Sequence, residues 1–358
     1  MTNHAQPPRA AFQIAGREIG DGHAPYIIAE VSGNHNKDLG KALAMIDVAA
    51  ECGADAVKFQ TYTADSLTLP SDKPDFQITS GTWAGWSLHR LYQEAATPYD
   101  WFPALFDHGR ARGITVFSSP FDNDAVDLLE GLETPAHKIA SNEFTDWPLI
   151  RHAAATGKPL ILSTGTATLE EIDDTVAFLE GEGARNYALL HCVSAYPAPI
   201  DSAHMRNITA LRERFPVPIG FSDHTLDITA PIVAACLGAA IIEKHFVLDR
   251  ADGGPDSSFA IEPHELKRLC ETVRDAHAAL GGPQFGMKDA ETKSPIYRRH
   301  FYTIRDIAAG ETIGPHNVKA IRARRGIAAR EFERLFGTTA RAAIPAHEPV
   351  TWEAVNER

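Results

Sequence analysis

The sequence has few cysteines and no long apolar run, and both facts narrow the class of protein. Its four cysteines, Cys52, Cys192, Cys236 and Cys270, are scattered along 358 residues. We interpret them as buried thiols, which excludes a disulfide framework and a cysteine metal cluster. No apolar run approaches the ~18 residues of a membrane span. The start, MTNHAQPPRA, lacks the basic and apolar segments of a secretory signal, so we expect a cytoplasmic protein without a membrane partner.

Positive charge is also scarce, but it is unevenly distributed. The net charge of −13 argues against a general nucleic-acid-binding protein. From residue 296 onward, 11 Lys/Arg stand against 7 Asp/Glu, so this segment carries +4 and the preceding residues carry −17. The basic segment is either a module that docks on an acidic body or an ordinary solvated face, and charge alone favours the second.

What the sequence does contain is a regular alternation of β-branched runs and helical segments. Eight runs have the composition of buried strands: 24–30, 55–62, 114–121, 136–141, 159–165, 187–194, 217–224 and 239–247. Strands that alternate with helices predict βαβ units and a parallel sheet. Eight units in about 250 residues predict an α/β fold of the closed (β/α)8 TIM barrel type. A doubly wound open sheet is the alternative, but no GxGxxG turn follows the first strand.

Two stretches interrupt this alternation. The connection 62–113 is long and contains an aromatic insert, GTWAGWSLHRLYQEAATPYDW. After a helical segment at 262–282, residues 283–295 are rich in glycine, proline and polar side chains, which predicts a linker. Residues 296–358 contain short runs without a strong helical repeat. We therefore predict a barrel domain over 1–282 and a small, mostly β domain over 296–358.

Two histidines stand at the ends of consecutive predicted strands, where the active sites of such barrels form. Paired strands lie about 4.8 Å apart, so the imidazoles of His224 and His245 can bind one divalent ion. Two protein ligands leave coordination positions open to water and substrate, which favours a catalytic ion over a structural one. A buried structural histidine is the alternative for either residue taken alone.

Other strand-end residues have the chemistry of an anion site. Lysines supply positive charge and hydroxyls supply directed donors for phosphate and carboxylate; the candidates are Lys58, Lys138, Ser119, Ser141, Ser163 and Ser222. Core ion pairs or strand-end caps would explain any one of them, but not all six. Glu30 and Asp256 are candidates for binding sugar hydroxyls or for a general base. For Asp256, in GGPDSS, a plain turn residue is an equal alternative.

The motifs at these positions resemble those of the sialic acid (nonulosonic acid) synthase family. The matching segments are AEVSGNH, DAVKFQTY, FSSPF, HKIASNE, LILSTG, LLHCVSAYP, GFSDHT and EKHF. The resemblance covers almost the whole chain and includes a C-terminal antifreeze-like (SAF, β-clip) domain from about Pro295. It implies a metal-dependent condensation of phosphoenolpyruvate with an N-acetylated amino sugar, with release of phosphate.

The resemblance also implies roles for single residues. His224 and His245 correspond to ligands of a Mn, Mg or Co ion. The six lysines and serines correspond to phosphoenolpyruvate-binding positions. Glu30, Tyr196 and Asp256 correspond to positions that contact the amino sugar, and Glu30 is in addition a candidate for proton transfer.

One arginine of the C-terminal domain has an implied role in a partner subunit. Arg322, in KAIRARRG, corresponds to an arginine that reaches into the neighbouring barrel and contacts the amino sugar, which implies a domain-swapped homodimer. The family usually has proline after this arginine, whereas this chain has Ala323. Arg324 and Arg325 are therefore alternatives for the same role.

The aromatic insert bears on the identity of the acceptor. It is similar to a segment typical of pseudaminic acid synthases, which implies 2,4-diacetamido-2,4,6-trideoxy-L-altrose as the sugar. An apolar loop near the pocket would suit the methyl group of a 6-deoxy sugar. Alternatively, the aromatic side chains only pack the insert against the barrel. N-acetylneuraminate or legionaminate synthase, with an N-acetylmannosamine-type acceptor, is the alternative activity.

Two further readings belong to other classes of protein. Lys58, Lys138 and Lys244 near strand ends are compatible with a Schiff-base aldolase, although alternation along the strand turns Lys244 away from the side of His245. In the second alternative, the C-terminal domain binds carbohydrate or ice and the barrel is only a scaffold. The complete set of polar strand ends argues against that reading.

Overall fold

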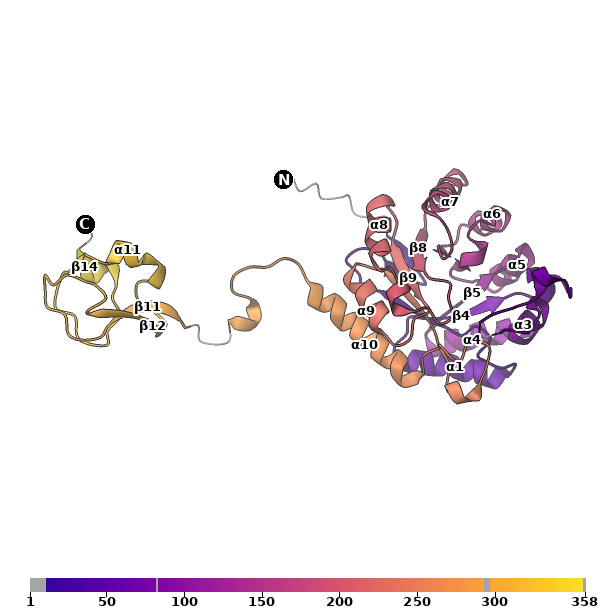
Figure 1. Ribbon diagram of the computed structural model, residues 1–358, viewed down its shortest axis with the longest axis horizontal. Helices are drawn as coiled ribbons and strands as arrows, with labels where there is room; N and C mark the ends of the chain where they lie inside the picture. The colour runs from indigo at the N-terminus through magenta and orange to yellow at the C-terminus, as the bar shows by residue number, and fades with distance from the viewer. Residues whose placement is uncertain (1–10, 82, 293–296, 357–358) are drawn as a thin grey trace. The chain divides into compact units, whose positions relative to one another are not determined.

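In the computed structural model, the residues described are 11–81, 83–292 and 297–356. The chain divides into two compact units, Met1–Gly281 and Gly282–Arg358 (Figure 1). The predicted boundary between residues 295 and 296 lies outside the described residues, as do the first ten residues.

Eight parallel strands form a closed barrel in which the last strand, β10, pairs with the first, β3. They are β3 (Tyr26–Glu30), β4 (Ala56–Thr61), β5 (Thr115–Pro120), β6 (His137–Ile139), β7 (Leu160–Ser163), β8 (Tyr187–Cys192), β9 (Ile219–Asp223) and β10 (Ile241–His245). Each strand lies within one of the eight predicted runs. The prediction of a TIM barrel is therefore confirmed.

Helices follow the strands and surround the barrel (Figure 1). They are α1 (Leu39–Cys52), α4 (Phe102–Arg112), α5 (Asn123–Gly131), α6 (Trp147–Ala155), α7 (Leu169–Gly181), α8 (Arg206–Arg214), α9 (Thr229–Cys236) and α10 (Pro263–Leu280). Two short helices, α2 (Ala64–Leu67) and α3 (Leu88–Ala95), lie in the long connection after β4. Across the described ranges, every helix is too short or too polar to cross a bilayer.

Side chains alternate along each strand between the helices and the barrel interior. Outward residues such as Ile27 and Val57 pack under the helices. Inward residues such as Ile28 and Phe117 form a separate apolar cluster inside the barrel. Two residues further along each strand, the inward position belongs to what we call the polar layer: Glu30, Lys58, Ser119, Lys138, Ser163, Cys192, Ser222 and Glu243.

On β9, the inward position at the level of the apolar cluster is a glycine instead of an apolar side chain. A Cβ atom at Gly220 on β9 would lie 2.4 Å from Leu190 and 2.6 Å from the carbonyl oxygen of Ile241. Only glycine fits at position 220, because a Cβ atom cannot approach other heavy atoms so closely. The interior beneath the polar layer is therefore fully packed.

A hairpin that the sequence did not predict belongs to this interior. Strands β1 (Phe12–Ile14) and β2 (Arg17–Ile19) pair antiparallel. Phe12, Ile14 and Ile19 are buried in the same cluster as Tyr26 at the start of β3. Strands of three residues are too short to show a clear alternation in sequence, so the hairpin escaped prediction. It closes the end of the barrel opposite the polar layer.

The C-terminal unit is small and mostly β, as predicted. Strands β11 (Arg298–Thr303) and β12 (Val318–Ala323) pair antiparallel, as do β13 (Thr339–Ala340) and β14 (Val355–Asn356). A four-residue helix, α11 (Phe332–Leu335), lies between the two pairs in sequence. The core of the unit is apolar and contains Phe301, Ile307, Ile313, Val318, Ile327, Leu335, Ala340, Ile344, Val350 and Val355.

The unpredicted hairpin gives a test of stability. Ile14 is completely buried, so Ile14→Ala removes buried methyl and methylene groups and leaves a cavity. We expect a loss of about 2–5 kcal/mol in the free energy of unfolding, measured by chemical denaturation. Gln13→Ala, on the exposed side of the same strand, should change it by less than about 0.5 kcal/mol. Equal stability of the two variants would show that the hairpin does not support the barrel core.

Candidate active site

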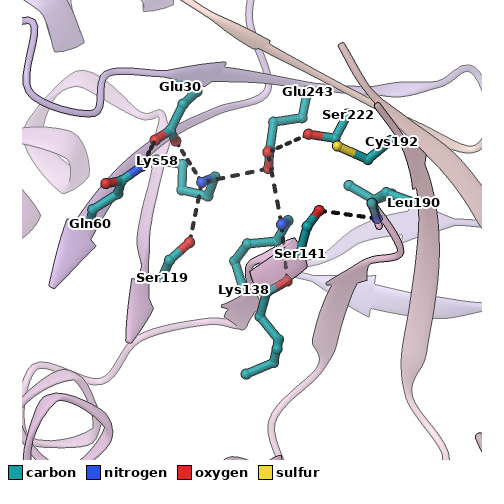
Figure 2. Close-up of polar contacts among 12 residues, drawn as sticks. Glu30, Lys58, Gln60, Ser119, Lys138, Ser141, Leu190, Cys192, Ser222 and Glu243 are labelled. Atoms are coloured by element: carbon teal, nitrogen blue, oxygen red, sulfur yellow. Dashed lines mark hydrogen bonds and ion pairs between the residues drawn. The ribbon is translucent and has the colours of Figure 1, made fainter. Parts of the chain in front are cut away.

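Two lysines and two glutamates meet in the polar layer (Figure 2). Lys58 Nζ lies 2.7 Å from Glu30 Oε2 and 3.8 Å from Glu243 Oε2. Lys138 Nζ lies 3.9 Å from Glu243 Oε1. All four side chains are buried, and their charges balance. Buried charges are tolerated when they are paired in this way, and Glu243 is the member that contacts both lysines.

Hydroxyl and amide groups complete the hydrogen bonds of this ionic group. Lys58 Nζ donates to Ser119 Oγ at 3.2 Å, and Ser222 Oγ donates to Glu243 Oε1 at 3.0 Å. Glu30 Oε1 accepts from Ser32 Oγ at 2.6 Å and from Gln60 Nε2 at 2.9 Å. Glu30, Lys58, Ser119, Ser222 and Glu243 come from β3, β4, β5, β9 and β10, and Figure 2 shows that their side chains point toward one another. The arrangement is therefore held by the barrel itself and not by a flexible loop.

The two glutamates have pKa values shifted in opposite directions. Burial raises the pKa of Glu30, and the positive charge of Lys58 offsets this only in part. Burial also acts on Glu243, but Lys138 and Lys58 together hold its pKa below the ordinary value. The surroundings thus shift the pKa of Glu30 upward and that of Glu243 downward. Such a pair can divide the acid and base roles of a reaction.

His224 and His245 lie side by side at the rim, each two residues beyond a member of the polar layer. Their ring centroids are 5.2 Å apart. His224 Nδ1 lies 2.8 Å from the carbonyl oxygen of Val193, so we assign the proton to Nδ1, which leaves the lone pair of Nε2 free. A second ring nitrogen bonded to a carbonyl is typical of metal-binding histidines.

The Nδ1 atom of His245 also lies near polar groups. Its Nδ1 lies 3.4 Å from Ser32 Oγ and 3.8 Å from Asp256 Oδ2. Burial lowers the pKa of His245 well below its ordinary value, and the neutral imidazole is the form that binds a metal. The donor set of His224 and His245 therefore fits a divalent ion with positions left open.

Aromatic rings surround the two imidazoles. The ring of Tyr196, which follows β8, lies 4.3 Å from that of His224, and the ring of Phe259 lies 5.1 Å from that of His245. Asp256 stands in the loop after β10, where burial and the nearby Glu30 carboxylate raise its pKa to about 7.

These residues line a cavity of about 220 Å³. The predicted site residues around it are Glu30, Lys58, Lys138, Ser141, Ser163, Tyr196, Ser222, His224, His245 and Asp256. Ser119 accepts a hydrogen bond from Lys58 but does not itself line the cavity. Arg322 is exposed on β12 of the C-terminal unit, and its role in a partner's barrel stays a prediction.

One wall of the cavity comes from the long connection after β4. It is mostly apolar or aromatic and includes Tyr62, Leu67, Trp83, Leu91, Tyr92 and Ala95. The insert therefore reaches the site and does more than pack on the outside of the barrel.

Glu243, Cys192, Ser32 and Glu143 are among the residues near the cavity that were not predicted as site residues. Glu243 could have been recognised, because it lies two residues before His245 and so shares its face of the strand. Cys192 lies two residues after Leu190, which faces the barrel interior, so alternation along β8 directs Cys192 to the same side. Its Sγ is 3.7 Å from His224 Nδ1. Ser32 and Glu143 stand beyond strand ends, where no alternation signals their direction.

Glu143 is notable because its carboxylate is incompletely bonded. It ends a 3-10 turn (Ser141–Glu143) after β6 and lines the cavity near Lys138 and Tyr92. Its Oε2 atom is buried and has no hydrogen-bond partner among the described residues. Burial raises the pKa of this carboxyl to about 7.

Lys244 does not face the cavity. Its Nζ donates to Asp223 Oδ2 and, at 2.6 Å, to the carbonyl oxygen of Thr225. This ion pair is on the outward side of β9 and β10, as alternation predicts. Of the three lysines considered for a Schiff base, only Lys58 and Lys138 therefore line the cavity.

A separate cluster of possible metal ligands, Glu262, His264 and Glu265, stands at the start of α10. Arg250 forms ion pairs with both glutamates. Arg250 thus neutralises part of the charge of the cluster, which lies outside the cavity.

Comparisons with known proteins agree with this arrangement. The NeuB family model matches residues 45–284, and the SAF domain model matches residues 298–356. A pseudaminic acid synthase of Campylobacter jejuni is 40% identical over 315 residues, which are 88% of this chain and 92% of that protein. One of Helicobacter pylori is 39% identical over 329 residues, 91% and 96% of the two chains.

A solved structure shows the same fold. It is the N-acetylneuraminic acid (sialic acid) synthetase of Leptospira borgpetersenii serovar Hardjo-bovis, in complex with citrate. Its TM-score is 0.72 at 31% identity, and the match covers 80% of this chain and 96% of that one. The resemblance stated from the sequence motifs is confirmed.

Glu143 predicts a pH-dependent difference in stability. Its folded-state pKa of about 7 exceeds the ordinary 4.5, so the folded state favours the protonated carboxyl. The contribution of the protonated carboxyl to the free energy of unfolding is fully present below about pH 4.5 and is lost as the pH rises through about 7. We expect metal-free Glu143→Gln to melt at the wild-type temperature near pH 5 and at a higher temperature near pH 8.

The same substitution at Glu271, exposed on α10, is the control for this measurement. It should leave the pH dependence of thermal unfolding unchanged. A Glu143→Gln effect of the same size at both pH values would contradict the assignment.

Proposed function

The chain belongs to the NeuB family, and we propose that it condenses phosphoenolpyruvate with 2,4-diacetamido-2,4,6-trideoxy-L-altrose, giving pseudaminic acid and phosphate. One observation carries the proposal. Lysines and serines whose chemistry suits an anion line the same cavity as two imidazoles, in a chain 40% identical to a pseudaminic acid synthase. The enzyme is therefore a transferase that forms a carbon–carbon bond.

We assign the phosphoenolpyruvate to the polar layer. Its phosphate and carboxylate would replace Glu30 and Glu243 as partners of Lys58 and Lys138, so that the lysine charges stay compensated. Ser163 Oγ is buried without a hydrogen-bond partner in the described part of the chain. It is therefore available to a substrate oxygen. Ser141, which accepts from the backbone N–H of Gly165, and Ser222, which donates to Glu243, also line the cavity.

We assign a divalent ion, Mn or alternatively Mg or Co, to His224 and His245. When bound, such an ion would polarise the aldehyde oxygen of the amino sugar as a Lewis acid. The chain's own contribution is to fix both rings, through the Val193 carbonyl on one side and Ser32 with Asp256 on the other.

The proton transfers fall to the carboxyl groups of the cavity. C3 of phosphoenolpyruvate bonds to the aldehyde carbon, and the new alkoxide takes up one proton. Water adds to C2 and gives up one proton. The bond from C2 to the phosphate oxygen then breaks, and the proton of the new C2 hydroxyl goes to the departing phosphate as the ketone forms. Glu30, whose pKa burial raises, is suited to exchange protons in these steps. Tyr196 and Asp256 line the part of the cavity beside the imidazoles and are proposed to contact the sugar.

We further propose that the cytoplasmic enzyme is a domain-swapped homodimer. Arg322, or Arg324 or Arg325 beside it, would enter the partner's cavity to contact the amino sugar. Arg322 lies directly opposite Arg299 across β11 and β12. Like charges placed opposite each other are unfavourable, so this pair would be stabilised by an anionic surface or ligand.

The acceptor can be tested directly. Purified enzyme is incubated with Mn²⁺, phosphoenolpyruvate and one of three sugars: the diacetamido altrose, the bacillosamine-derived mannose analogue or N-acetylmannosamine. We expect mass spectrometry to show the condensed product mainly with the first. A preference for N-acetylmannosamine would replace the acceptor and leave the reaction class in place. Phosphate release that requires neither metal nor sugar would contradict the reaction class.

If His224 and His245 bind the metal, replacing either histidine should abolish most of the activity. His224→Ala or His245→Ala should lower kcat by more than about 100-fold, since even residues that only orient metal ligands are worth 10–100-fold. EDTA should abolish wild-type activity, and Mn²⁺ should restore it. His264→Ala, in the exposed α10 cluster, is the matched control and should stay active. Activity that survives EDTA, together with borohydride trapping at Lys58 or Lys138, would favour the Schiff-base aldolase.

A further inference from the structure

Trp83 connects the aromatic insert to the loop above the histidines. It belongs to the long connection after β4, but its indole Nε1 donates to the carbonyl oxygen of Pro255 at 3.0 Å. The next residue in that loop is Asp256, whose Oδ2 lies 3.8 Å from His245 Nδ1. The two segments are separated by more than 150 residues in sequence, yet they enclose the same cavity.

The ring of Trp83 forms part of the cavity wall. Its centroid lies 6.0 Å from that of Tyr196, which in turn lies 4.3 Å from that of His224. A series of rings thus leads from the proposed metal position outward to the insert. Leu67 and Leu91, which the same connection contributes to the wall, are apolar.

The hydrogen bond to Pro255 limits what Trp83 can recognise. Indole has a single polar group, the Nε1 donor, and no acceptor. Because that donor is already bonded, the ring presents only carbon to the cavity. A hydroxyl group placed against it would lose its water without gaining a partner, which is unfavourable. A methyl group in the same place would be stabilised by leaving water.

The proposed reaction fixes which end of the sugar reaches this wall. The aldehyde carbon must lie between the imidazoles and the polar layer, because it bonds to C3 of phosphoenolpyruvate. C6, at the other end of the acceptor, is then directed away from the histidines and toward the insert. The inference rests on this orientation, and so on the proposed function.

We propose that Trp83 is a specificity-determining residue that receives the C6 methyl group of the acceptor and disfavours sugars with a hydroxyl at C6. Its hydrogen bond to Pro255 keeps the indole donor away from the sugar. The bonded ring, and not the insert as a whole, therefore distinguishes a 6-deoxy acceptor from its hydroxylated analogue.

The test compares two acceptors that differ at C6 alone: 2,4-diacetamido-2,4,6-trideoxy-L-altrose and 2,4-diacetamido-2,4-dideoxy-L-altrose. At saturating phosphoenolpyruvate, we expect the wild-type kcat/KM to favour the 6-deoxy sugar by about tenfold or more, the discrimination that a small apolar contact provides. Trp83→Leu should bring this ratio close to one through a higher KM for the 6-deoxy sugar. The KM for phosphoenolpyruvate should not change.

Three further variants separate recognition from folding. Trp83→Phe keeps an apolar ring and should retain most of the preference, whereas Trp83→Gln offers polar atoms to the cavity and should favour the hydroxylated sugar. Trp86→Leu is the matched control, because Trp86 lies in the same insert but does not line this cavity. It should keep the wild-type ratio. Thermal unfolding identifies any variant that is not folded.

Distinct outcomes would overturn the two proposals. A wild type that uses both sugars equally, or a folded Trp83→Leu or Trp83→Gln that keeps the wild-type ratio, contradicts the role of Trp83. If Trp83→Leu does not fold, the ratio of kcat/KM for the two acceptors in Trp83→Gln tests the role of Trp83. If neither variant folds, the wild-type ratio is the remaining test. A wild type that is inactive with both sugars but active with N-acetylmannosamine contradicts the proposed acceptor itself.

Discussion

The buried ionic group of Glu30, Lys58, Glu243 and Lys138 is the constraint on which the rest of the site depends. Four charges at the end of a packed barrel are tolerable only as partners, and removing one partner of a buried pair typically costs about 3–5 kcal/mol. The apolar cluster beneath them and the hydroxyls of Ser119 and Ser222 leave little freedom to rearrange. In the proposed reaction, phosphoenolpyruvate would exchange partners with the lysines, and the carboxylates that it displaces would stay beside the reacting atoms.

The fold could be predicted from the sequence because its signals are long and periodic. Eight β-branched runs, each ending in polar residues, were enough to predict the barrel. Together with the family resemblance, they led to ten predicted residues that line one cavity. The hairpin β1–β2 was missed because three residues show no period. Ser32 and Glu143 were missed because they lie beyond strand ends, where direction is set by turns. Glu243 was visible as a strand-end residue, but its contact with both lysines depends on the closure of the barrel.

The role of the aromatic insert could not be derived from its composition. Trp83 and Trp86 look equivalent in sequence, and both lie in a segment rich in aromatic residues. Only the three-dimensional structure distinguishes them, because the hydrogen bond from Trp83 to Pro255 joins two loops that are remote along the chain. The bonding state of one indole nitrogen then determines what the wall can recognise, and no local pattern encodes that state.

The ion pair between Asp223 and Lys244 has a consequence on the other side of the barrel wall. These residues are register partners on β9 and β10, and each directly precedes one of the two histidines. By fixing the two strands at this point, the pair holds His224 and His245 in position relative to each other. For the proposed divalent ion, the entropy of bringing the two ligands together would then be lost at folding and not at binding. Such an ion would exchange without disturbing the strands that carry its ligands.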